Sequence, residues 1–433
     1  MKSKSFTLST RRSLLFGALG GLSFYAYQKL KSSPYWPDEG RFFNPCMGSL
    51  LPSTLAQHEV SLSALEGLDT RQIWDSHVHL IGIGDTASGT WVNPRSRHLS
   101  SPWRYLQFKF FFNAACPDAE TSVDEGYVTR LKSLLWGSGN KLLLLAFDYA
   151  HNEKGEALPQ HSAFYTPNQY AMSIHEQFFD SFEWIASIHP YRQDSIEALH
   201  HAFAHGARGV KWLPSAMGID PASPLCQRFY HTMARLDIPL LCHAGTEHAA
   251  PGMGKEEYGN PLKLRYPLEQ GVKVVIAHCA STGSSPDLDQ GEHGPKKSNF
   301  ELFIRLMEEN RYEGLLFGDI SAIAHLNRVG TALEPLLTRP EWHPRLLYGS
   351  DYPLPGVIPI ISLKFLVEKK YLTFEQAQVL AQLRLHNPLW FDFVLNRHLQ
   401  FQGHHFSHEV FLTRSFWTGA RFWKVTTPRK NMG

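Results

Sequence analysis

Cysteine, net charge and long apolar runs are all scarce in this sequence. The five cysteines are scattered and include no C-x-x-C pair; they are Cys46, Cys116, Cys226, Cys242 and Cys279. An odd and sparse set of this kind predicts no disulfide framework. The formal net charge is only +2, so no excess of basic residues calls for a nucleic-acid partner. The apolar stretch at residues 14–27 is shorter than the roughly 20 residues that a membrane span requires.

Apolar and aromatic residues, in contrast, are plentiful. Hydrophobic side chains make up 43% of the 433 residues and aromatic side chains 13%, including 28 Phe. This content suits a large core or an apolar substrate channel. The length exceeds one ordinary domain, yet α/β barrels hold about 250 residues or more in a single unit.

The N-terminal segment has the features of a targeting signal. Residues 10–15, Thr-Arg-Arg-Ser-Leu-Leu, resemble a twin-arginine export (Tat) signal, and the apolar stretch 14–27 follows directly. Such segments are addresses and are excluded from fold reasoning. No clear A-x-A cleavage site follows, so the segment either is a cleaved signal peptide or stays as an anchor. We therefore expect an exported protein, in the periplasm or attached to the outer face of the inner membrane through residues 1–31, with a linker and N-terminal extension over residues 32–69.

Eight apolar runs, separated mostly by helical stretches, occupy residues 70–395. Continuous apolar runs are typical of strands buried on both faces of a parallel sheet, and eight of them favour a (β/α)8 TIM barrel over an open sheet. Each run finishes at a titratable residue, in order His79, Asp148, His189, Lys211, His243, His278, Asp319 and Asp351. Because the C-terminal strand ends build the active site of such barrels, these side chains are expected to meet there. The clearest helices are predicted at residues 166–180, 194–205, 223–236 and 299–310.

Two segments do not fit the repeating pattern. Residues 82–112 follow the first strand, contain many aromatic side chains and are too long for a simple connection. We interpret them as a partly helical insertion that covers the barrel mouth, or alternatively packs on the barrel side or on an oligomer partner. Residues 396–433 form an aromatic and basic C-terminal extension. We expect this extension to pack on the barrel rather than lie at a membrane interface.

A histidine pair directs attention to metal chemistry. His77 and His79 stand two residues apart at the end of the first strand, so their imidazoles point the same way and can reach one cation. A lone histidine at a strand end is more often a hydrogen-bonded core residue, and Lys211 alone could be a snorkelling or ion-paired lysine. Further histidines and an aspartate at the corresponding ends of other strands favour a metal site.

The chain contains six short motifs: Asp75-Ser-His77-Val-His79, His189-Pro-Tyr-Arg192, Gly206-Ala-Arg-Gly-Val-Lys211, Cys242-His243-Ala-Gly245, Ala277-His278-Cys279 and Tyr348-Gly-Ser-Asp351-Tyr-Pro353. Together they resemble the amidohydrolase superfamily, in the amidohydrolase-related branch that includes aminocarboxymuconate-semialdehyde decarboxylase-like enzymes. They span residues 70–395. The resemblance implies a metal-dependent barrel enzyme over this range.

The resemblance also implies one of two metal arrangements. In the one-metal arrangement, the ion is held by His77, His79, His243 and Asp351, and His278 is a catalytic acid or base. In the two-metal arrangement, a carbamylated Lys211 bridges the ions and His278 binds the second one. We expect one Zn²⁺, with two divalent ions as the alternative, and Asp351 and His278 as the catalytic residues.

The function implied by the resemblance is a metal-dependent hydrolase that uses a metal-activated water on an amide, ester or lactone bond of a small molecule. A decarboxylase or hydratase on the same barrel is the alternative, and a non-catalytic metal-binding barrel is the second alternative.

Arg192 could bind a substrate carboxylate or form a structural salt bridge. Asp319 could orient a ligand histidine, and Asp148 and His151 could support the site from behind. A homo-oligomer and a membrane tether remain open, and no nucleic-acid partner is expected.

Overall fold

The computed structural model describes residues 37, 39–117, 122–247, 249–250 and 252–419. The predicted export signal and the end of the predicted C-terminal extension, residues 420–433, lie outside these ranges. No helix within the described ranges has both the length and the apolar character needed to cross a bilayer.

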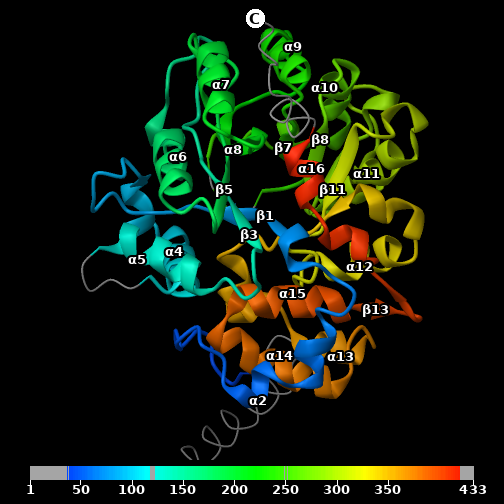
Figure 1. Ribbon diagram of the computed structural model, residues 1–433. Coiled ribbons are helices and arrows are strands. Elements are labelled where there is room, and N and C mark those ends of the chain that lie inside the picture. Colours follow the sequence, from blue (N-terminus) through cyan, green and yellow to red (C-terminus); the bar gives the residue numbers. More distant parts are fainter. Residues whose placement is uncertain (1–36, 38, 118–121, 248, 251, 420–433) are drawn as a thin grey trace, which may run out of the picture.

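Eight parallel strands, in one group of three and one group of five, lie in the centre of the molecule (Figure 1). Pairing follows the order of the chain, from β1 through β3 to β5 and from β6 through β7, β8 and β11 to β12. A bridge between Ala186 and Val210 joins the two groups on one side, and a bridge between Val78 and Tyr352 joins them on the other. The predicted (β/α)8 barrel is therefore confirmed. Its strands are β1 (Trp74–His79), β3 (Lys141–Leu145), β5 (Phe182–Ile185), β6 (Val210–Trp212), β7 (Leu240–His243), β8 (Val274–Ala277), β11 (Leu316–Asp319) and β12 (Leu346–Leu347).

Helices surround the barrel, and local sequence signals set where several of them begin. A capping box of Ser298 and Glu301 starts α11, and one of Thr373 and Gln376 starts α14. The four helices expected from the sequence are present with shorter bounds, as α6, α7, α9 and α11. The helices are α5 (Val123–Ser133), α6 (Asn168–Gln177), α7 (Ser195–Ala204), α8 (Pro214–Met217), α9 (Gln227–Leu236), α10 (Arg265–Glu269), α11 (Asn299–Glu308), α12 (Val329–Leu337), α13 (Leu363–Glu368), α14 (Phe374–His386) and α15 (Pro388–His398).

The barrel has separate inner and outer apolar layers. The inner layer consists of side chains that point to the barrel axis, and Trp417 joins it from the C-terminal segment; its other members are Trp74, Leu143, Leu145, Ile185, Leu241, Val275, Ala277 and Leu347. Most other buried apolar residues of the strands belong to one much larger cluster that they form with the helices. Since Trp417 lies on α16 (Arg414–Thr418) and donates from Nε1 to Ser76 Oγ at 2.7 Å, this helix closes the N-terminal end of the barrel.

The insertion after β1 is partly helical, as expected. It contains β2 (Trp91–Val92), which pairs with β4 (Phe164–Tyr165), and α4 (Pro102–Ala115). A disulfide between Cys46 and Cys116 ties the N-terminal extension to the end of α4. The scattered cysteines predicted no disulfide framework, yet this one disulfide forms, because the fold brings together residues that lie 70 positions apart. The other three cysteines are free and buried.

Candidate metal centre

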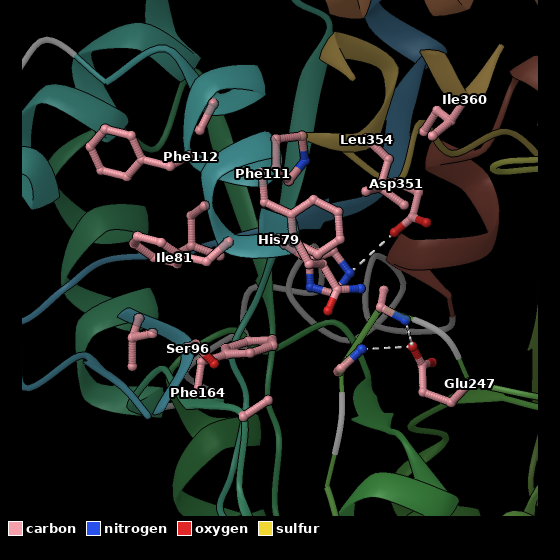
Figure 2. Close-up of a pocket in the computed structure, with 18 of the residues that line it drawn as sticks. His79, Ile81, Ser96, Phe111, Phe112, Phe164, Glu247, Asp351, Leu354 and Ile360 are labelled. Carbon is pink, nitrogen blue, oxygen red and sulfur yellow. Dashed lines mark hydrogen bonds and ion pairs between the residues drawn. The ribbon is translucent and has the colours of Figure 1, made fainter. Parts of the chain in front are cut away.

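The C-terminal ends of the strands bring six predicted side chains to one cavity of about 550 Å³. They are His77, His79, Lys211, His243, His278 and Asp351. Figure 2 shows the interaction that joins His79 to Asp351 within this cavity.

An irregularity in β1 aims both predicted histidines into the cavity. The pairing register of β1 with β3 shifts between Asp75 and Val78, so Trp74 belongs to the inner layer and Val78 to the outer one. A shift of this kind changes which side chains face inward. Asp75 holds the irregular stretch in place, since its Oδ1 accepts hydrogen bonds from the backbone N–H of His77 at 3.1 Å and of Ser350 at 2.8 Å.

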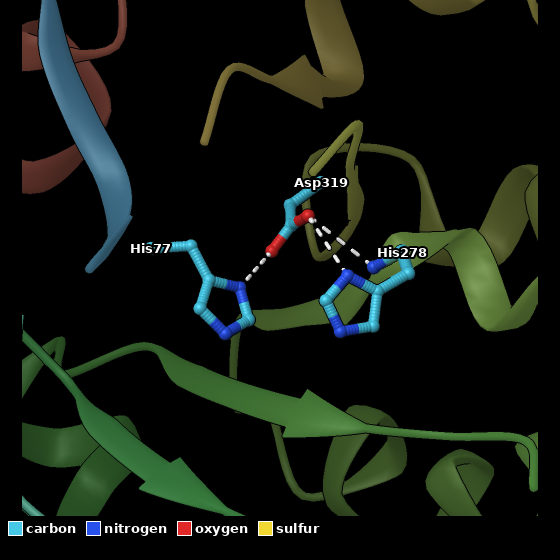
Figure 3. Close-up of side chains that lie close together, drawn as sticks. All are labelled: His77, His278 and Asp319. Atoms are coloured by element: carbon cyan, nitrogen blue, oxygen red, sulfur yellow. Dashed lines mark hydrogen bonds and ion pairs between the residues drawn. The ribbon is translucent and has the colours of Figure 1, made fainter. Parts of the chain in front are cut away.

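The carboxylate of Asp319 fixes the orientation of His77 (Figure 3). Asp319 Oδ2 lies 2.7 Å from Nδ1 of His77, and both side chains are fully buried. A carboxylate that accepts from Nδ1 leaves the Nε2 lone pair free for a metal. Glycine is required at position 349 for this arrangement, because a Cβ there would lie 2.8 Å from the Cβ of His77.

Asp351 is the centre of the cluster. Its Oδ1 lies 3.1 Å from Nε2 of His79 and 3.4 Å from Nε2 of His77, and its Oδ2 lies 3.7 Å from Nε2 of His278. The backbone of Asp351 is in the left-handed region, with φ of 59°, and His278 is in the same region, with φ of 54°. Non-glycine residues in this region are uncommon and cluster at functional sites.

The hydrogen bonds of His278 define its tautomer. Its Nδ1 lies 2.7 Å from Ser321 Oγ and 3.1 Å from the Ser321 carbonyl oxygen. Since a carbonyl oxygen only accepts, the network assigns the proton of His278 to Nδ1. The Ser321 hydroxyl in turn donates to Asp319 Oδ1. The unprotonated Nε2 of His278 therefore faces Asp351.

Burial and neighbouring charges set the ionisation of the cluster. Burial lowers the pKa of His77, of His278 and, to about 4, of His243, so that these imidazoles are neutral near pH 7. Burial also lowers the pKa of Lys211. Burial alone would raise the pKa of Asp351, but the neighbouring histidines outweigh it and hold that pKa well below its usual value. Neutral imidazoles beside an ionised carboxylate are the protonation states that bind divalent metals.

His243 and Lys211 complete the polar floor of the cavity. Lys211 is 1% exposed, and its Nζ lies 3.1 Å from Nε2 of His77. Nε2 of His243 lies 3.3 Å from Glu247 Oε2, yet it is buried and has no hydrogen bond of good geometry to any described residue. A buried imidazole nitrogen without a hydrogen bond is costly unless another ligand takes it.

These donors fit a divalent metal. The ligand atoms of His77, His79 and Asp351 all lie within 4.8 Å of one another. A second group, His77 with His278 and Asp319, also meets this distance, but its members already satisfy one another through the hydrogen bonds of Asp319 and Ser321. The first group, with the open nitrogen of His243 beside it, offers imidazole and carboxylate ligands that suit zinc and related metals.

Apolar side chains form most of the cavity wall beyond the polar floor. Phe111 and Phe112 of α4, Phe164 of β4 and Ile81 point into it from one side, as Figure 2 shows. Leu354 and Ile360, which follow β12, line it as well. The insertion therefore covers the mouth of the barrel.

Besides Asp319, which lies behind His77, four residues that the sequence placed near the site are not among those that line the cavity: Asp148, His151, His189 and Arg192. Arg192 forms ion pairs with Asp148 at 2.8 Å and with Asp194 at 2.6 Å. The rings of His151 and His189 lie 4.7 Å apart, and His189 Nε2 bonds to the Met217 carbonyl oxygen at 3.1 Å. The geometry thus matches the structural salt bridge that was the alternative for Arg192.

Several polar residues at the site were not singled out in the sequence. Glu247 and Arg328 line the cavity, and Ser321 links His278 to Asp319. Glu247 stands four residues after His243 in a glycine-containing loop, a weak signal. Ser321 and Arg328 follow the β11 aspartate closely, but nothing local distinguishes them from ordinary loop residues.

A closed barrel whose strand ends converge on histidines and an aspartate defines a metal-dependent barrel enzyme. The model of the family described as Amidohydrolase matches residues 149–389, more than half of the chain. The chain therefore belongs to the amidohydrolase family, in its aminocarboxymuconate-semialdehyde decarboxylase-like branch. Enzymes of this family depend on metal ions.

Comparisons with other proteins give weaker similarities. No curated protein matches this sequence. Solved structures include an uncharacterized TIM-barrel protein from Bordetella bronchiseptica (14% identity, 68% of this chain and 89% of that chain, TM-score 0.41). A second is a probable 2-pyrone-4,6-dicarboxylic acid hydrolase from Acinetobacter baumannii (16% identity, 72% of this chain and 99% of that chain, TM-score 0.39). A third is a 2,6-dihydroxybenzoate decarboxylase from Rhizobium (10% identity, 65% of this chain and 87% of that chain, TM-score 0.37). The assignment rests on the family match, not on these structures.

Proposed function

We propose that this protein is a zinc-dependent hydrolase that cleaves an amide, ester or lactone bond of a small molecule. The observation that carries the proposal is the convergence of Nε2 of His77, Nε2 of His79 and Oδ1 of Asp351. His77, His79, Asp351 and His243 would hold one ion. When bound, a divalent metal supplies a Lewis acid that polarises a carbonyl group and acidifies water.

The protein's own groups then handle the proton. Asp351 is ionised near neutral pH because the neighbouring histidines hold its pKa low, so it can accept a proton from the attacking water. His278 is neutral and presents its unprotonated Nε2 to Asp351 Oδ2 at 3.7 Å. A proton taken up at Asp351 can pass through this nitrogen to the leaving group. Asp319 and Ser321 keep His278 and His77 oriented throughout.

Metal counting and activity assays test the proposal together. Zinc per chain is measured for the purified protein and for His77→Ala and Asp351→Ala, with His231→Ala as a control on an exposed histidine. We expect about one zinc in the unaltered protein and in the control, and much less in the two site variants. Full metal content in both site variants would rule out the assigned ligands.

Activity assays on the same purified protein distinguish hydrolysis from the lyase alternative. Panels of esters, lactones and amides are assayed beside release of CO₂ from carboxylic acids and addition of water to unsaturated acids. We expect hydrolysis that His278→Ala abolishes. Release of CO₂ or hydration, without hydrolysis, would replace the hydrolase by a decarboxylase or a hydratase.

We also propose that the protein is exported. Two observations support this: the twin-arginine-like residues 10–15, which lie outside the described ranges, and the disulfide between Cys46 and Cys116. Disulfides persist in oxidising compartments and are rare in the cytosol. Cell fractionation of the full chain, with an Arg11→Lys/Arg12→Lys variant as control, tests the proposal. Recovery of both forms in the cytosol would overturn it.

A further inference from the structure

The cavity has two chemically different parts. The floor carries the histidines, Asp351 and the buried cation of Arg328, whereas the wall is built from aromatic and aliphatic side chains of α4, β4 and the chain after β12. Phe111 and Phe112 of α4 line this space, and so do Leu354 and Ile360 (Figure 2). A cavity of about 550 Å³ with such a wall accommodates a sizeable apolar group.

Arg328 is a buried cation among the residues that line the cavity. It is 8% exposed, and Nη1 donates to Ser281 Oγ at 3.0 Å. Its Nε has no hydrogen-bond partner among the residues that the structure describes, and within those residues it forms no ion pair. Arg192, in contrast, is paired with two aspartates. Burying an unpaired charge is expensive, so a cation in this state is expected to serve a ligand.

Helix stability does not explain the position of Arg328. It occupies the residue before α12, which starts at Val329, and its side chain makes no cap hydrogen bond. The N-terminus of a helix is its positive end, where a cation is unfavourable and an anion is favoured. Asp351 and Glu247 are near enough to offset part of its charge. When a metal engages Asp351, that offset falls and an added anion becomes more favourable.

We propose that the substrate is an amphipathic carboxylate: its acid group pairs with Arg328, and its long alkyl or aromatic part lies along the apolar wall formed by α4. The inference deepens the proposed hydrolase function and rests on it only for the position of the bond that is cleaved. Esters, amides or lactones that carry both a free acid and a large apolar group fit this description. Short dicarboxylates, which have no apolar part, do not.

Binding measurements on the zinc-loaded protein test both halves without any turnover. Titration calorimetry compares decanoate, decanol, octanoate and acetate. We expect decanoate to bind at least about tenfold more tightly than decanol, because a charged hydrogen bond to Arg328 adds to the apolar contact. Each added methylene from octanoate to decanoate is expected to tighten binding about fourfold. Equal affinity for decanoate and decanol, or no gain from octanoate to decanoate, would overturn the inference.

Variants test the contact of the acid group with Arg328 and the contact of the apolar part with α4 separately. Arg328→Gln should lose the preference for decanoate over decanol while it keeps the affinity for decanol, and Arg328→Lys should restore part of the preference. Phe111→Ala should weaken both ligands equally. Arg339→Gln is the matched control, since this arginine lies on the surface and pairs with Glu308. Zinc content is measured in every sample, so that loss of the metal is not mistaken for loss of Arg328. Unchanged decanoate preference in a folded, zinc-loaded Arg328→Gln would overturn the role of Arg328.

The outcomes separate this inference from the proposed function. Should the unaltered protein bind decanoate as expected but cleave no ester, amide or lactone, the hydrolase fails and the amphipathic site stands. Should it hydrolyse a polar substrate and ignore decanoate, the hydrolase stands and the amphipathic site fails. If Arg328→Gln does not fold, Arg328→Met, which keeps an unbranched side chain without the charge, takes its place under the same criteria, because decanoate can also be preferred through the zinc.

Discussion

Asp319 controls which nitrogen of His77 reaches the cavity. It is fully buried, and its two oxygens accept from His77 Nδ1, from Ser321 and from the backbone N–H of His278. Burial alone would raise the pKa of Asp319, but its interactions with His77, His278 and the Ser321 hydroxyl outweigh burial and hold this pKa below its usual value. One carboxylate thus holds two imidazoles in the orientation that the site needs.

Replacing Asp319 by Asn is expected to weaken zinc binding about 10- to 100-fold, because an amide neither fixes the tautomer of His77 nor raises its basicity. Competition with a fluorescent zinc indicator measures the change. Asp289→Asn removes a surface carboxylate that pairs with Arg265 and should leave zinc affinity unchanged. An Asp319→Asn variant that binds zinc like the unaltered protein would show that His77 is oriented by other groups.

His325 offers a pH test that does not involve a proposed ligand. It is buried, and burial together with the charge of Arg328 lowers its pKa to about 3. The unfolded chain binds this proton below about pH 6.5, whereas the folded chain takes it up only near pH 3. The unfolded state therefore binds more protons in this window, and stability is lost as the pH falls through it.

We expect His325→Gln to reduce the pH dependence of unfolding by about 1.4 kcal/mol per pH unit between roughly pH 5.5 and 4.5. Urea unfolding of chelator-treated protein at several pH values measures this slope. Exposed His231→Gln is the control and should keep the slope of the unaltered protein. Parallel slopes for His325→Gln and the unaltered protein would show that His325 titrates normally.

At the scale of single elements, the sequence predicted strands better than it predicted their geometry. All eight apolar runs are strands, because parallel strands buried on both faces leave a strong hydrophobic signal. The register shift in β1 leaves no such signal, since plain alternation from Trp74 would have turned Val78 inward and His77 outward. The shift depends on Asp75 bonding to Ser350, which lies 275 residues away.

The candidate site likewise has some features that the sequence predicts and others that it does not. Ligand candidates at strand ends could be predicted, because a barrel gathers its C-terminal ends. The pairing of His77 with Asp319 spans 242 residues, and that of Ser281 with Arg328 spans 47. Contacts of this kind are set by packing, and a single sequence does not reveal them. The disulfide was missed for the same reason.

That disulfide secures α4 above the cavity. Near it, Phe43 stacks on Phe110 of α4 with ring centroids 4.8 Å apart, and the backbone N–H of Asn44 donates to Asn113 at 2.7 Å. The bond closes a long loop, which restricts the unfolded chain. The N-terminal extension therefore stabilises the wall that we assign to the apolar part of the substrate.

Removing the disulfide with Cys46→Ala/Cys116→Ala is expected to lower the free energy of unfolding by about 2 to 4 kcal/mol. Urea unfolding measures the loss. Reductant should cause the same loss in the unaltered protein and none in the variant, since the remaining cysteines are free. If the variant and the oxidised protein are equally stable, the hydrogen bond and ring stacking alone hold α4.

At the scale of the whole molecule, the two ends of the barrel have separate tasks. The C-terminal end is open to the cavity and carries every proposed ligand. The N-terminal end is sealed by the C-terminal segment, in which Thr413 bonds to the backbone of Trp74, Val410 accepts from the backbone N–H of Tyr348 at 2.8 Å, and Trp417 enters the inner layer. Stability and chemistry are therefore expected to separate by position along the barrel axis.

A pair of tryptophan substitutions tests this separation. Trp417 is 2% exposed and Trp103, on α4, is 83% exposed. Trp417→Ala removes a large buried ring and its hydrogen bond to Ser76, so we expect a loss of about 3 to 5 kcal/mol in the free energy of unfolding, measured by urea denaturation. Trp103→Ala should change it by no more than about 0.5 kcal/mol. Both folded variants should keep full zinc content, because neither ring touches a proposed ligand. Similar losses of unfolding free energy in the two variants would contradict the expected separation. Loss of zinc from folded Trp417→Ala alone would show that the two ends of the barrel are coupled.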